Sequence, residues 1–64
     1  MEKMIEAVRG LKEFRKKWGL TQVYCARGVG VSLLTWNLWE KGVNMPNMAN
    51  WEKLEKFLAF YEEE

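Results

Sequence analysis

Apolar side chains recur at steps of three and four residues along the first part of the chain, from Met1 to Trp18. They are Met4, Val8, Leu11, Phe14 and Trp18. This period places them on one face of a helix. The segment therefore predicts a single helix, which Gly10 interrupts at a cost of roughly 1 kcal/mol relative to alanine and which Gly19 ends.

Residues 21–42 predict two short helices joined by a glycine turn. Thr21 has the side chain of an N-cap, whose oxygen accepts a hydrogen bond from the first turn of a helix, and that helix is expected at 22–27. Residues 28–30 are expected to break the helix, because Gly30 can adopt the left-handed conformation at little steric cost.

The second helix of this pair is expected at 33–40, with Ser32 as its N-cap and Gly42 at its end. Ala26, in the middle of the first helix, has a small side chain that lets the second helix cross closely. The residues expected on the buried face of the pair are Val31, Trp36 and Trp39. This order of elements is a helix-turn-helix, the unit that places its second helix in the major groove of DNA.

The last helix is expected to open at Pro46 and Asn47, with Asn47 as its N-cap. Its apolar stripe consists of Met48, Trp51, Leu54, Leu58 and Tyr61, with Phe57 beside it. Closure of the core against the earlier helices is the role that this stripe indicates. Phe60 and Tyr61 are also candidates for contact with a second copy of the chain.

The composition excludes several classes of function but says less about the fold. The 64 residues indicate one domain, with a net charge of +1, one Cys and no His. Five of the ten basic residues lie between Arg9 and Lys17. A single Cys excludes an intrachain disulfide, and the lack of His argues against a metal site and against general-base catalysis. Cys25 is expected to be a small buried side chain. We expect a non-enzymatic, cytoplasmic protein without cofactor or membrane span.

The pattern L-T-Q-x-x-x-A-x-x-x-G-V-S-x-x-T-x-x-x-W-E-K-G-x-x-x-P, from Leu20 to Pro46, resembles lambda-type Cro/CI repressors and the xenobiotic-response-element-like regulators. The resemblance implies an all-α fold, a compact bundle of four helices, with five as the alternative, around a central helix-turn-helix. It also implies a small transcriptional regulator, bacterial, archaeal or phage-encoded, that binds double-stranded DNA as a weak homodimer.

The resemblance also assigns roles by position. The residues at base-reading positions are Leu33, Leu34, Asn37 and Leu38. The candidates for phosphate contact are Gln22, Thr35, Lys41, Arg27 and Lys17. Arg15 and Glu40 fall at positions that form an ion pair in the family, which would fix the first helix against the second helix of the motif.

Three leucines at base-reading positions depart from the usual polar residues of the family. Leucine can touch a thymine methyl but cannot make the bidentate hydrogen bonds that distinguish bases, whereas Asn37 can pair with adenine. An A·T-rich operator is therefore expected. The leucines also allow a second interpretation, in which Leu33, Leu34 and Leu38 form an apolar surface for a protein partner. A third is that the chain is an isolated or engineered part of a longer protein.

Overall fold

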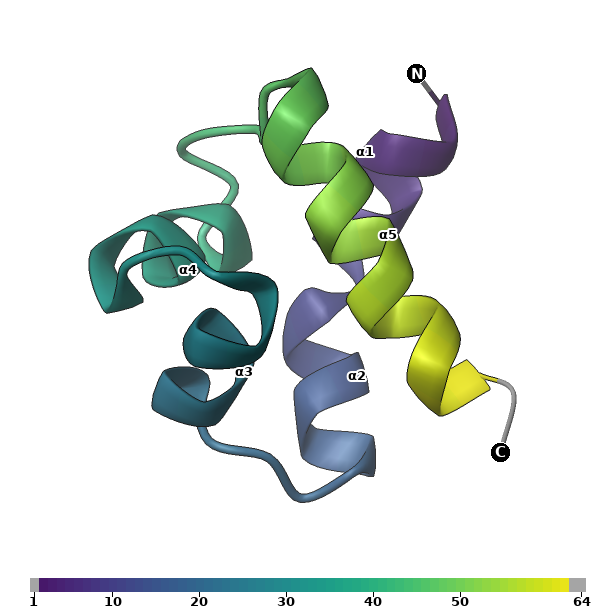
Figure 1. Ribbon diagram of the computed structural model, residues 1–64, viewed down its shortest axis with the longest axis vertical. Helices are drawn as coiled ribbons and strands as arrows, with labels where there is room; N and C mark the ends of the chain where they lie inside the picture. Colours follow the sequence, from purple (N-terminus) through teal and green to yellow (C-terminus); the bar gives the residue numbers. More distant parts are fainter. Residues whose placement is uncertain (1, 63–64) are drawn as a thin grey trace.

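The computed structural model describes residues 2–62, and these residues form five helices. In chain order they are α1 (Glu2–Arg9), α2 (Leu11–Lys17), α3 (Gln22–Val29), α4 (Leu33–Glu40) and α5 (Met48–Glu62). In Figure 1, α3 and α4 lie side by side, and α5 crosses in front of the N-terminal helices. The expected all-α fold with a central helix-turn-helix is confirmed.

The prediction of a single N-terminal helix is wrong, because the chain forms two helices that separate at Gly10. Gly10 has φ −92° and ψ 3°, outside the helical region, and its N–H donates to the carbonyls of Glu6 and Ala7. Glycine is the poorest helix former after proline, so the break falls at the weakest position of the segment. As a result, α1 and α2 each pack against α4. Met1 lies outside the described residues.

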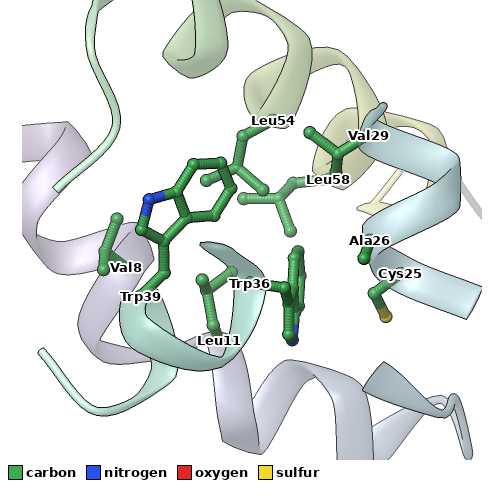
Figure 2. Packing of buried hydrophobic residues seen from close by; sticks show 9 residues of the cluster. All are labelled: Val8, Leu11, Cys25, Ala26, Val29, Trp36, Trp39, Leu54 and Leu58. Carbon is green, nitrogen blue, oxygen red and sulfur yellow. The ribbon is translucent and has the colours of Figure 1, made fainter. Parts of the chain in front are cut away.

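One apolar cluster forms the core, and α4 supplies its two largest members (Figure 2). Its buried members are Val8, Leu11, Cys25, Ala26, Val29, Trp36, Trp39, Leu54 and Leu58. The side chains of Trp36 and Trp39 leave the same side of α4, and almost none of their surface is exposed. Two buried indoles hold a helix of eight residues firmly by one side. The opposite side of α4 is left free.

The caps of the helix-turn-helix are those expected from the sequence. The side chain of Thr21 accepts a hydrogen bond from the N–H of Tyr24 at 3.0 Å, and that of Ser32 accepts one from Thr35 at 3.0 Å. Gly30 ends α3 with φ 93°, in the left-handed region. The expected end of α3 at Arg27 is wrong, because the helix continues through Gly28 and Val29.

Gly28 lies inside α3 because α5 passes too close for a side chain. A Cβ atom at this position would lie 2.5 Å from Cε1 of Phe57. The ring of Phe57 also packs edge-on against Phe14 and Trp36. Gly28 therefore serves helix packing rather than the turn.

The last helix begins as expected, since Oδ1 of Asn47 accepts a hydrogen bond from the N–H of Asn50 at 2.8 Å. Leu54 and Leu58 are buried, while Trp51, Phe57 and Tyr61 are half-buried around them. Met48 departs from the expected apolar stripe, because its side chain is exposed at the start of the helix. The stripe closes the core from its second turn onward.

Candidate nucleic-acid interface

The uncovered face of α4 carries all four residues expected to read bases. Leu33, Asn37 and Lys41 follow one another at four-residue steps, and Leu34 and Leu38 form the neighbouring row. Residues four apart lie above one another on a helix. The exposed fraction is 66% for Leu34 and 47% for Leu33, while Asn37 and Leu38 are half-buried. The two leucines of the first turn are therefore the apolar residues of this face most open to a ligand.

An open groove borders this face and runs between α2, α3 and α4. Its lining residues are Lys12, Arg15, Leu20, Thr21, Gln22, Val23, Leu33, Asn37, Glu40 and Lys41. The first turn of α3 opens here, and the backbone N–H groups of a first turn have no helical acceptors. Exposed Lys12 and Lys41 add positive charge. The groove thus combines features that attract an anion.

Glu40 is the single acidic residue that lines this groove in the described part of the chain, and its carboxylate is fully engaged. Nε of Arg15 donates to its Oε2 at 2.7 Å, and Nη2 of Arg15 donates to its Oε1 at 3.1 Å. The side-chain amide of Gln22 donates to Oε1 at 3.1 Å, and the indole N–H of Trp36 donates to Oε2. The carboxylate therefore joins α2, α3 and α4, and its charge is compensated within the protein.

This arrangement changes the acidity of both partners. Burial acts to raise the pKa of Glu40, but the hydrogen bonds from Arg15, Trp36 and Gln22 outweigh it and hold the pKa below its usual value. The same hydrogen bond to Glu40 raises the pKa of Arg15. Both groups are therefore ionised throughout the physiological range.

The residues expected to contact phosphate do not all lie together. Lys41 lies on the α4 face, and Gln22 lies beside it, with its side-chain nitrogen turned toward Glu40. Thr35 accepts a hydrogen bond from the hydroxyl of Ser32 at 2.9 Å, so its own hydroxyl hydrogen remains available. Arg27 is exposed on α3 but does not line the groove.

Lys17 stands apart from this face. It lines a second groove, between α2 and the end of α5, and its Nζ lies 5.4 Å from the centre of the Trp18 ring. The basic residues of α2 that line the groove beside α4 are Lys12 and Arg15, and Arg15 is paired with Glu40. The spacing could have identified Lys12, because it lies three residues before Arg15, and residues three apart share a helix face.

No other chemistry emerges from the described residues. Cys25 is buried, and its burial raises the pKa of the thiol to about 11. Within residues 2–62 no group of three or more acidic, His or Cys side chains is placed to hold a metal ion. None of the helices in that range is long and apolar enough to cross a membrane.

Comparison with protein families finds a match to the family described as Helix-turn-helix, over residues 11–64. Comparison with curated proteins and with solved structures found no match to this chain. The matched range takes in α2, the whole helix-turn-helix and α5, and with them the Arg15–Glu40 contact and the open face of α4. The chain therefore belongs to the Cro/CI-type helix-turn-helix family, whose members are DNA-binding regulators of transcription and typically not enzymes.

Proposed function

We propose that the protein is a small sequence-specific regulator, of the repressor type, that places α4 in the major groove of duplex DNA. The observation that carries this proposal is the asymmetry of α4. Its inner side is held by two buried indoles and by the hydrogen bonds of Glu40, while its outer side is open. A rigid helix with a free face is what direct readout of base edges requires.

Phosphate contacts supply most of the affinity in this proposal. Lys12 and Lys41 flank the groove at the first turn of α3, and the uncapped backbone N–H groups of a first turn can bind an anion. Because the carboxylate of Glu40 is already paired with Arg15, it opposes an incoming phosphate less than a free carboxylate would. Gln22 and Thr35 add hydrogen bonds to phosphate in this proposal, and Arg27 and Lys17 belong to a wider set of basic contacts.

Sequence preference comes from α4. Asn37 is the side chain on its face that can pair with N6 and N7 of adenine, and Leu33, Leu34 and Leu38 can contact thymine methyl groups. The operator is therefore proposed to be A·T-rich. Two copies joined weakly near Phe60 would extend the contact to two half-sites, because this aromatic ring is exposed at the end of α5.

A second candidate function rests on the same leucines. The exposure of Leu33 and Leu34 makes an apolar patch that another protein could cover. In that case the fold is retained and α4 binds a partner instead of bases. Salt separates the two functions, because phosphate contacts release counterions and weaken steeply with salt, whereas apolar docking changes little.

Selection from a random duplex library tests the proposal directly. The selected duplex is then titrated at two salt concentrations with the parent protein and with a variant carrying Leu33→Gln, Leu34→Gln and Leu38→Gln. We expect steep salt dependence for both proteins and an altered sequence preference for the variant, with circular dichroism confirming that it is folded. Unchanged preference would refute base reading by the leucines. Absence of any duplex binding by the parent at low salt would refute DNA binding.

A further inference from the structure

The first turn of α4 presents alkyl groups where base-reading helices usually present hydrogen-bonding groups. Leu34 and Leu33 are the most exposed leucines of the described chain, at 66% and 47%. Of the polar side chains that flank them, Ser32 is engaged, because its hydroxyl caps the helix and donates to that of Thr35. Thr35 keeps its hydroxyl hydrogen for the phosphate contact proposed above. At this end of α4 the contact offered to a base edge is therefore apolar.

An alkyl side chain can detect one feature of a pyrimidine in the major groove, the methyl group on C5. Thymine carries this methyl beside an acceptor at C4, whereas cytosine carries a donor at C4 and a bare C5. Leucine can make no hydrogen bond to either group at C4. Methylation of cytosine adds the missing methyl at the position that it occupies in thymine, so Leu33 and Leu34 have no means of telling thymine from 5-methylcytosine.

We propose that the first turn of α4 recognises the 5-methyl group of pyrimidines whichever base carries it, so that cytosine methylation strengthens binding. This inference rests on the proposed function. It goes further in two respects: the contact is assigned to the methyl group rather than to an A·T pair, and the regulator becomes sensitive to a modification of its DNA.

The surroundings of the leucines favour DNA over an apolar protein surface as the source of these methyl groups. Leu33 lines the same groove as Lys12 and Lys41, and the carboxylate there is compensated by Arg15. An occupant that matches this surface places methyl groups against the leucines and negative charge beside the lysines. A methylated pyrimidine and its flanking phosphates supply both at short range.

The expected effect follows from the size of a methyl group. Burial of one such apolar group changes affinity by about fourfold. Each 5-methyl group that contacts Leu33 or Leu34 should therefore contribute about that factor, independently of salt. Phosphate contacts, in contrast, should respond to salt and not to methylation.

Three pools of random-sequence duplexes test the inference. The first contains thymine and cytosine, the second replaces thymine by uracil and so has no 5-methyl groups, and the third contains uracil and 5-methylcytosine. Binding is measured by fluorescence anisotropy with the parent protein, with Leu34→Gln and with Met48→Gln. Met48 is a matched control, because its exposed side chain stands at the start of α5 rather than on α4.

We expect the parent and Met48→Gln to bind the first and third pools more tightly than the second, by about fourfold for each methyl in contact. Leu34→Gln should bind with a clearly smaller difference between the pools. Equal binding of the parent to all three pools would overturn the inference while leaving duplex binding intact. A preference for the first pool alone would also overturn it, since the contact would then depend on thymine itself. Failure to bind any pool at low salt would overturn the proposed function as well.

Discussion

Removal of the Arg15 side chain tests whether the contacts of Glu40 hold the helix-turn-helix in place. Arg15→Ala deletes two of the four hydrogen bonds that reach this carboxylate and leaves those from Gln22 and Trp36. The side chains of Arg15 and Glu40 are only 18% and 5% exposed, so water cannot fully replace the lost donors. Each hydrogen bond to a charged group contributes about 1.5–3 kcal/mol, and partial exposure and the remaining donors reduce the loss. We therefore expect the free energy of unfolding to fall by about 1–3 kcal/mol.

Urea unfolding, followed by tryptophan fluorescence and circular dichroism, measures this loss. With a slope near 1 kcal/mol per molar, the midpoint should fall by about 1–3 M. Lys3→Ala is the matched control, because the Lys3–Glu55 ion pair has side chains that are 81% and 43% exposed. Exposed pairs contribute about 0.2–1 kcal/mol. A midpoint for Arg15→Ala no lower than that of Lys3→Ala would show that the Arg15–Glu40 contact stabilises the fold no more than an exposed ion pair does.

The pH dependence of stability gives an independent check on the same carboxylate. The pKa of Glu40 is lowered in the folded protein from its ordinary value of 4.5. Its contribution is therefore fully present above that value and is lost as the pH falls through the lower, folded pKa. Glu40→Gln should be less stable than the parent at neutral pH, and the difference should shrink below about pH 4.5. A difference that is constant from pH 7 to pH 3 would contradict the lowered pKa.

Three further predictions concern other parts of the fold. Gly28→Ala should lower stability in urea by about 1–3 kcal/mol, because the new Cβ meets Phe57. Gly10→Ala should leave stability unchanged or raise it by up to about 1 kcal/mol, because its Cβ would meet only ordinary contacts. Equal effects of the two substitutions would contradict the close packing at Gly28. Cys25 should react slowly with a thiol reagent under native conditions, because the thiol is buried and its pKa is raised to about 11; rapid labelling would show that α3 opens. Sedimentation should reveal weak dimerisation through the region from Phe57 to Tyr61, and a strictly monomeric protein at high concentration, with and without DNA, would count against it.

Local rules were sufficient to predict the helix-turn-helix. The hydroxyl side chains of Thr21 and Ser32 suit the N-cap position of a helix, and both residues occupy it. Gly30, which has no side chain, suits the left-handed position at the end of a helix and occupies that. The burial of Trp36 and Trp39 followed from their spacing. Such features depend on a few neighbouring residues, so they can be read from one segment at a time.

Features that depend on distant packing were not predicted. From the sequence, Gly28 was assigned to the turn because it lies two residues before Gly30. Its real role could not be predicted, since the residue that packs against it, Phe57, is far away in the sequence. The continuous periodicity from Met4 to Trp18 concealed the break at Gly10, since both halves contribute to the same core, α1 through Val8 and α2 through Leu11. Lys17 was expected to contact phosphate together with the α4 residues, but it lines the groove between α2 and the end of α5, and the packing of α5 on α2 could not be predicted from one segment.

The salt dependence of duplex binding tests most directly the claim that the open face of α4 and its groove bind DNA. Affinity for the selected duplex is measured over a range of salt concentrations for the parent, for Lys41→Ala and for Lys53→Ala, which removes an exposed lysine of α5. Each phosphate contact adds about 0.9 to the slope of log affinity against log salt concentration. We expect Lys41→Ala to reduce the slope by about 1 and Lys53→Ala to leave it unchanged. Equal slopes for all three proteins, or a loss confined to Lys53→Ala, would contradict DNA binding at the open face of α4.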